Sequence, residues 1–312
     1  MTMSETVPSV DHYYGNLQRY VKQICWGLSD LLILEAGAGI GKSYQIETTM
    51  EQYAKGPTKT VAGYISPMQL HKALYDARHE DSVLFLDDVS GLEDERAMES
   101  LKAATWSTDG ERRVAWSSTT NKLDDNQKEF TFKGRLIICT NDLSSNAHME
   151  AVLSRGKVYH MDFDYHERME IIREVAKAPY TVGEDKPHVD IRYDTSLDER
   201  MEVAEWIDTF TDETTHSKIN LRMLFHCLDN LGFCQVDEDT DADAWKDLSS
   251  DLFTFNEDLS LVQQLMRKHA SVKDARNEFE ERTGLSRSTF FNRKRNLEER
   301  LGSKLKPQGE TQ

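Results

Sequence analysis

Cysteine, proline and long apolar runs are scarce in this chain of 312 residues. No apolar run approaches the roughly 18 residues that a membrane-spanning helix needs. The first ten residues have neither a basic start nor an apolar stretch, so we expect no secretory leader. The four cysteines lie in apolar segments without metal-ligand spacing, which predicts buried, reduced thiols in a cytoplasmic protein. They are Cys25, Cys139, Cys227 and Cys234.

Positive charge is also in short supply, because 38 Lys and Arg face 55 Asp and Glu, a net charge of −17. This balance argues against nucleic-acid binding over the whole surface. It reverses between Arg267 and Lys306, where twelve basic and six acidic residues give a net charge of +6. A basic end on an acidic body indicates a separate module with its own partner.

Strands and helices alternate in the first half of the chain. Strands are expected at 31–34, 60–65, 81–88, 136–140 and 157–163, and helices at 11–28, 44–53, 68–78 and 92–106. This alternation predicts a parallel α/β sheet covered on both faces. Two more strands, 113–118 and 130–133, predict a hairpin. From residue 165 the periodicity is helical, at 165–178, 197–210 and 221–231, and the acidic stretch 236–251 predicts a solvated connector.

A phosphate-binding loop is the strongest motif. Four apolar residues, Leu31–Leu34, run into a glycine-rich turn that ends in Gly41-Lys42-Ser43, as in a Walker A motif. The glycines let backbone N–H groups turn toward phosphate oxygens, Lys42 reaches the β- and γ-phosphates, and Ser43 binds Mg²⁺. The motif predicts ATP and Mg²⁺ as ligands. The expected nucleotide contacts are Ala36, Gly37, Ala38, Gly39, Ile40, Gly41, Lys42, Ser43 and Tyr44.

Two further apolar strands end in polar residues. Val83–Leu86 delivers Asp87 and Asp88, which has the form of a Walker B strand. Asp87 is the expected second Mg²⁺ contact, and Asp88 is expected to orient or deprotonate water. The strand 136–140 ends in Asn141, whose amide can position the attacking water or simply cap a turn.

In this combination of motifs the chain resembles the AAA+ ATPase family over roughly residues 10–232. The resemblance makes Asn141 the sensor-1 residue. It also makes Arg155, in the segment 151–156, an arginine finger that reaches the γ-phosphate of a neighbouring subunit. Arg222 takes the place of sensor 2. The family implies Lys42, Asp88, Asn141, Arg155 and Arg222 as catalytic residues, and a homo-oligomer, ring or helical, as the assembly.

Some positions depart from the family pattern or leave two interpretations. The family most often ends Walker B in Asp-Glu, so the shorter Asp88 must reach its water through a shifted backbone or a second water. Tyr64 lies where many rings have a pore-loop aromatic, or it is a core strand residue. The hairpin around Asn121-Lys122 has an acidic tip, which argues against a DNA contact there.

The C-terminal segment 279–291 resembles a helix-turn-helix unit for double-stranded DNA. Gly284 makes the turn, Ser286 caps the second helix, and Phe279, Leu285, Phe290 and Leu297 are expected to close the core. A basic cap that docks on the acidic body is the alternative. The expected DNA contacts are Arg287, Ser288, Thr289, Asn292, Arg293 and Arg295.

These features predict a parallel-sheet P-loop AAA+ core with a helical lid and a small all-α helix-turn-helix domain. The expected divisions are 1–28 (N-terminal helix), 29–163 (core), 164–235 (lid), 236–258 (acidic linker), 259–303 (helix-turn-helix) and 304–312 (tail). We expect a cytoplasmic ATP hydrolase that acts on DNA or DNA-bound complexes, as in replication initiation, helicase loading, transposition or phage DNA processing. The competing hypotheses are an ATP-switched DNA-binding regulator with little turnover, and a protein-unfolding ring.

Overall fold

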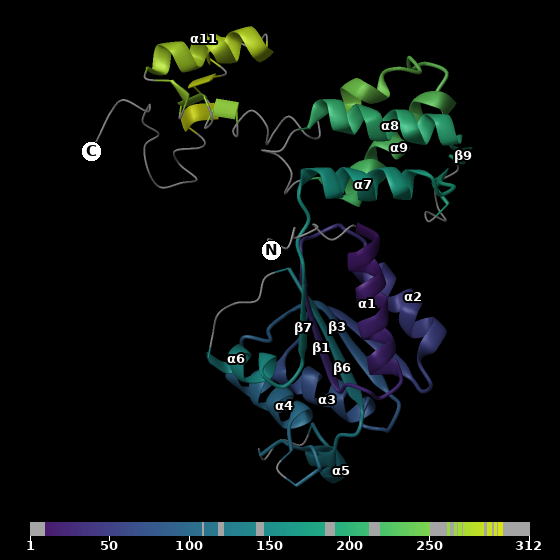
Figure 1. The fold of residues 1–312 in the computed structure, drawn as a ribbon, viewed down its shortest axis with the longest axis vertical. Coiled ribbons are helices and arrows are strands. Elements are labelled where there is room, and N and C mark those ends of the chain that lie inside the picture. The colour runs from purple at the N-terminus through teal and green to yellow at the C-terminus, as the bar shows by residue number, and fades with distance from the viewer. Residues whose placement is uncertain are drawn as a thin grey trace, which may run out of the picture. The chain divides into compact units, whose positions relative to one another are not determined.

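The computed structural model divides into two units, Met1–Phe163 and Asp164–Gln312 (Figure 1). It describes residues 10–107, 109–117, 122–141, 147–184, 191–211, 219–249, 261–262, 265–266, 268–269, 271–283, 286–288, 290–291 and 293–295. Within the described residues, no helix is long and apolar enough to cross a membrane.

The first unit contains a five-stranded parallel sheet in the order β2-β3-β6-β1-β7. This confirms the predicted α/β class. The central strand β6 lies between β1 and β3, so the three strands end side by side at one edge. The strands are β1 (Leu31–Ala36), β2 (Thr58–Tyr64), β3 (Val83–Ser90), β6 (Arg135–Thr140) and β7 (Lys157–Met161).

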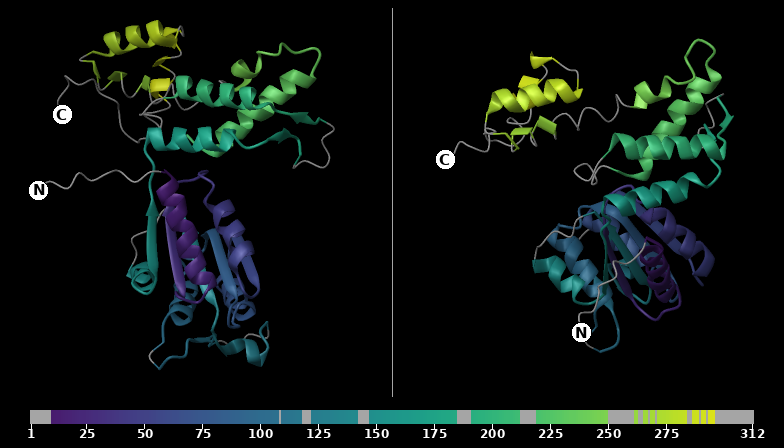
Figure 2. Two further views of the ribbon diagram at one scale, coloured as in Figure 1. Left: turned by 45° about the vertical axis from the view of Figure 1, so that its right-hand side comes forward. Right: turned by 45° about the horizontal axis from the view of Figure 1, so that its top comes forward.

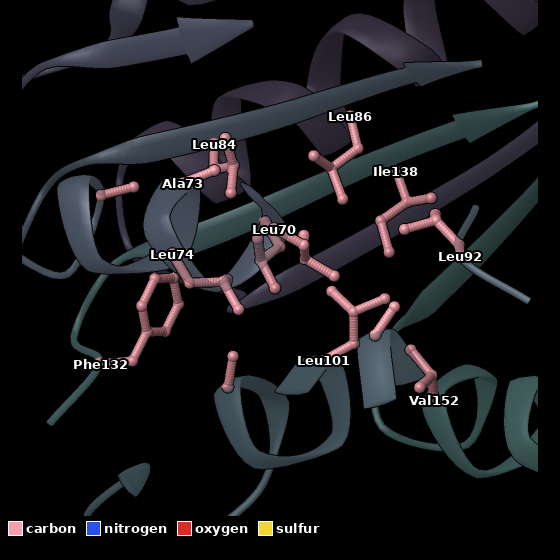
Figure 3. Close-up of a cluster of buried hydrophobic side chains, with 14 of the residues drawn as sticks. Leu70, Ala73, Leu74, Leu84, Leu86, Leu92, Leu101, Phe132, Ile138 and Val152 are labelled. Carbon is pink, nitrogen blue, oxygen red and sulfur yellow. The ribbon is translucent and has the colours of Figure 1, made fainter. Parts of the chain in front are cut away.

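Helices cover both faces of the sheet. On one face α1 (Val10–Cys25) packs against α2 (Lys42–Tyr53), β1 and β6 (Figure 2). On the other face α3 (Pro67–Asp76), α4 (Glu95–Thr105) and α6 (Ala147–Leu153) close an apolar core. Leucines of α3, β3 and α4 meet there, together with an isoleucine of β6 (Figure 3).

Capping residues set several helix limits. Ser66 Oγ accepts a hydrogen bond from the Gln69 N–H, and the Ser66 N–H donates one to Gln69 Oε1, which completes a capping box. Pro67 occupies the first turn, where its missing N–H costs nothing. Helix α3 therefore begins one residue before the expected limit.

The predicted hairpin is present, although its strands are shorter than expected. Strands β4 (Arg113–Ala115) and β5 (Glu129–Thr131) pair antiparallel, and the short helix α5 (Asp125–Lys128) precedes β5. Asn121 lies outside the described residues.

The second unit is helical at its start, as predicted, with α7 (Tyr165–Ala176), α8 (Leu197–Phe210) and α9 (Leu221–Val236). A two-stranded ribbon, β8 (Thr181–Val182) with β9 (Tyr193–Asp194), was not expected. The prediction that residues 236–251 form a solvated connector is wrong in part. Trp245 is 2% exposed and packs in the core that α7, α8 and α9 share. One large aromatic side chain offsets the acidic composition around it, because its burial removes a large apolar area from water.

A second small core lies nearer the C-terminus. Helix α11 (Val272–Thr283) contributes Ala275 and Phe279. These side chains pack against Phe290 and against three apolar residues that precede the helix. The rings of Phe279 and Phe290 meet edge to face, with centroids 5.4 Å apart. The three apolar residues that precede the helix are Val262, Leu265 and Met266. The other two expected core residues, Leu285 and Leu297, lie outside the described residues.

Candidate active site

The glycine-rich loop connects β1 to α2 at the carboxyl edge of the sheet. Gly39 and Gly41 have φ values of 71° and 80°, in the left-handed region that favours glycine. Gly41 is also the residue that precedes the first turn of α2. The loop therefore has the backbone that a phosphate-binding turn requires, with the N-terminus of a helix directly behind it.

The Lys42 side chain lies inside this loop. The residue is 6% exposed, and its ammonium group donates to the Ala36 carbonyl (2.5 Å), to the Gly37 carbonyl (3.3 Å) and to Asn141 Oδ1. A buried ammonium needs such acceptors because it has lost its hydration. The same contacts pin the start of the loop to the end of β6.

Asn141 connects Lys42 to Asp88. Its Nδ2 donates to Asp88 Oδ2 at 2.7 Å, while its Oδ1 accepts from Lys42. Lysine is only a donor and an ionised carboxylate is only an acceptor, so this arrangement fixes the orientation of the amide. The turn-capping interpretation of Asn141 does not explain these two side-chain contacts.

The expected metal ligands also meet. The Ser43 hydroxyl donates to Asp87 Oδ1 at 2.9 Å. Neighbouring oxygens in octahedral Mg²⁺ coordination are about 2.9 Å apart, since each lies about 2.0–2.1 Å from the ion. The hydroxyl–carboxylate pair therefore fits the ligand type and spacing that Mg²⁺ requires.

Asp88 has an unusual backbone. Its φ of 48° is in the left-handed region, which Asp and Asn adopt more readily than Glu does. This bend lies within β3 and directs the Asp88 carboxylate to Asn141. The short side chain of Asp88 was expected to need either a shifted backbone or a second water. The left-handed conformation at Asp88 corresponds to the first of these.

Cys139 lies next to the site. The sequence predicted that this thiol is buried, but not that it is close to Asp87. It is free and 1% exposed, and it lies beside Asp87 in the register of β3 and β6. Burial raises the pKa of Cys139 to about 12, and the neighbouring Asp87 and Asp88 add to the rise against an opposing effect of Lys42. The thiol is therefore neutral at physiological pH. The other three cysteines are buried and free as well.

Arg155 is bound within its own subunit. Its Nη1 donates to the Lys102 carbonyl at 2.9 Å, and its guanidinium lies 5.8 Å from the ring centroid of Trp106. Lys102 belongs to the last turn of α4, where helix carbonyls lack helical partners. Trp106 is 57% exposed, so the Arg155 guanidinium lies next to an aromatic ring at the protein surface.

Several other expected site residues can be placed. Ala36 and Ile40 are buried, whereas Tyr44 is 73% exposed beside the loop. Tyr64 is 72% exposed, so its assignment to the core is wrong. Arg222 is an exposed residue of α9 in the second unit, and its sensing role stays a prediction.

The residues that were expected to contact DNA differ in their exposure to solvent. Arg287, Ser288 and Arg295 are exposed, as a DNA-contacting surface requires. The expectation that Arg293 faces outward is wrong, because it is partly buried and its guanidinium lies 5.5 Å from the Phe279 ring centroid. Cation–π contact with the small core explains this position. Thr289 and Asn292 lie outside the described residues.

No protein-family model matches the chain. A curated relative is the uncharacterized 36.7 kDa protein of the nrdC-mobD intergenic region of Enterobacteria phage T4. The two are 32% identical over 157 residues, which are 45% of this chain and 47% of that protein. The chain thus spans about half the length of the curated relative it matches.

Similar solved structures include a mutant RuvB of Thermotoga maritima, with a TM-score of 0.46, 14% identity, and coverage of 95% of this chain and 91% of that one. Domain III of the replication initiation protein DnaA of the same organism gives 0.43, with 18% identity and coverage of 80% and 93%. NtrX from Brucella abortus, solved with ATP, gives 0.46, with 14% identity and coverage of 95% and 69%. Because these TM-scores are below 0.5, the assignment of the fold rests on strand order and site geometry.

Proposed function

We propose that the chain is an Mg²⁺-dependent ATP hydrolase of the AAA+ family. The observation that carries this proposal is the hydrogen-bonded series Lys42–Asn141–Asp88 beside the pair Ser43–Asp87. Three adjacent strands bring these groups to one edge of the sheet, which is where ligands bind in parallel α/β sheets.

Each residue of the site has a role that its position supports. Lys42 would neutralise phosphate charge, and the N–H groups of residues 37–43 would donate to the phosphate oxygens. Ser43 and Asp87 would hold Mg²⁺, which when bound would supply positive charge next to the transferred phosphoryl group. Asp88 accepts a proton from the attacking water or orients it, and Asn141 holds the Asp88 carboxylate in place.

The strand order supports the family assignment. The strand β6 lies between the P-loop strand β1 and the acidic strand β3, and the polar residue Asn141 follows directly after it.

Assembly into a homo-oligomer is the second part of the proposal. Arg155 would stabilise the transition state on a neighbouring subunit, as an arginine finger does. In the structure it is bound to the Lys102 carbonyl, so assembly has to exchange this contact for one with phosphate oxygens. A phosphate is the stronger partner because both groups are charged.

Double-stranded DNA is the proposed partner of the C-terminal module. Lys268 and Arg282 both pair with Glu278, so part of the positive charge of the module is balanced internally. Arg287 and Arg295 present exposed side chains. These two arginines are the best candidates for base-edge and phosphate contacts.

The primary test is nucleotide binding and phosphate release by the full chain, with and without duplex DNA. Lys42→Ala should abolish ATP binding, because it removes the ammonium group and its links to the loop. Lys59→Ala is the matched control, since Lys59 forms an exposed ion pair with Asp76 on β2 and α3. Equal ATP binding by Lys42→Ala and the parent would contradict the proposal.

The alternative function is an ATP-switched DNA-binding regulator with little or no turnover. It is supported by Asp88, which differs from the family's usual glutamate and is held by Asn141. ATP binding without phosphate release at any protein concentration, with or without DNA, would favour this alternative.

A further inference from the structure

Tyr14 on α1 makes a polar contact with the phosphate-binding loop. Its hydroxyl donates to the carbonyl oxygen of Ile40, 26 positions later in the chain. Ile40 directly precedes the Gly41-Lys42-Ser43 end of the loop and is 2% exposed. Tyr14 was not among the residues that the motifs singled out.

This contact fixes one peptide plane of the loop. In a trans peptide the carbonyl of residue 40 and the N–H of residue 41 point in opposite directions. Holding the Ile40 carbonyl toward α1 therefore directs the Gly41 N–H away from α1. Gly41 has a φ of 80°, a conformation from which a glycine peptide could otherwise rotate at little cost.

The Tyr14 ring is itself held in place. It stacks on Phe163, with centroids 5.9 Å apart and planes 20° apart. Tyr13 packs edge-on against the same ring at 5.0 Å, and Phe163 is 1% exposed. Since α1 also packs on α2, the hydroxyl is presented to the loop from a rigid surface.

We propose that Tyr14 is a positioning residue of the nucleotide site, which orients the Gly41 N–H toward the phosphates by anchoring the Ile40 carbonyl. This inference rests on the proposed binding of nucleotide at the loop. Preorganisation of a donor reduces the entropy lost on binding, so the anchor increases affinity without touching the ligand.

The test is Tyr14→Phe in the full chain, which removes the hydroxyl and keeps the ring on Phe163. One net hydrogen bond corresponds to a change in Kd of about fivefold. We expect Mg·ADP to bind about fivefold more weakly by calorimetry, at unchanged stoichiometry. If the protein turns over ATP, KM should rise with kcat nearly unchanged, because the donor binds ground state and transition state alike.

Tyr20→Phe is the matched control. Tyr20 lies on the same helix and packs against Tyr159, with centroids 5.0 Å apart. This variant should bind Mg·ADP like the parent. A purely structural role of the Tyr14 hydroxyl would instead reduce the binding-competent fraction, and so the stoichiometry, without changing Kd. That result, or an unchanged Kd in Tyr14→Phe, overturns this inference alone, whereas failure of the parent to bind any nucleotide overturns the proposed function as well.

Discussion

The role of Asp88 can be tested with two substitutions that separate its charge from its backbone conformation. Asp88→Asn removes the carboxylate but keeps a side chain that tolerates the φ of 48°. Asp88→Glu keeps the carboxylate but places a longer side chain at a left-handed position. The two variants should therefore fail in different ways.

For Asp88→Asn we expect unchanged ATP affinity and unchanged stability, with a loss of turnover. Removal of a general base lowers kcat by about 10²–10⁴-fold, or about 3–5 kcal/mol of transition-state stabilisation. For Asp88→Glu we expect hydrolysis to persist. Left-handed strain should cost about 1 kcal/mol of the free energy of unfolding, which lowers the melting temperature by about 2–4 °C in a unit of this size.

Steady-state phosphate release, binding of a fluorescent ATP analogue and thermal unfolding measure these three quantities. Hydrolysis by Asp88→Asn at the parent rate would refute the reasoning, since another group would then position the water. Equal melting temperatures for Asp88→Glu and the parent would show that the bend at residue 88 carries no strain.

Three other predictions concern assembly, DNA and pH. Mixtures of Arg155→Ala and Lys42→Ala subunits should regain part of the turnover, and no recovery in mixtures shown to co-assemble would assign Arg155 to its own subunit. In anisotropy titrations of the full chain, Arg295→Ala should weaken all DNA sequences alike, and Arg287→Ala should cost about 1–3 kcal/mol at the preferred site only; salt-independent binding would contradict both. The raised pKa of Cys139, about 12 against 9.0 for a thiol exposed to water, means that unfolding releases a proton at high pH. Stability should fall as pH rises from 9 toward 12, less steeply in Cys139→Ser, and a pH-independent denaturation midpoint would argue against a buried neutral thiol.

The sheet and its site were predictable where the information is local. Four-residue apolar runs that are followed within three residues by Gly, Asp or Asn identify buried parallel strands and the edge at which they end. Strand β2 shows the limit of this signal, since nearly all of its side chains are exposed and its predicted start was two residues late. The β8–β9 ribbon has two residues in each strand, too few for any periodicity.

Contacts between distant segments were not predictable from the motifs. Chain order does not reveal that β6 lies between β1 and β3, and this placement is what links Asn141 to both Lys42 and Asp88. Trp245 lies in a sequence whose composition favours solvent, and only the apolar surface of the neighbouring helices explains its burial. The contact between Tyr14 and Ile40 depends on how α1 packs, which no local pattern encodes.

The bonding of Lys42 suggests how nucleotide binding prepares the site for hydrolysis. The ammonium shares its donors among two neutral carbonyls and the Asn141 amide. Phosphate oxygens are charged acceptors and form hydrogen bonds roughly twice as strong as neutral ones, so a bound triphosphate competes for the same donors. Once Lys42 turns to phosphate, the Asn141 oxygen loses its partner while its Nδ2 remains on Asp88. The amide oxygen would then be available to accept a hydrogen bond from a water beside the γ-phosphate, which would couple occupancy of the loop to the position of the nucleophile.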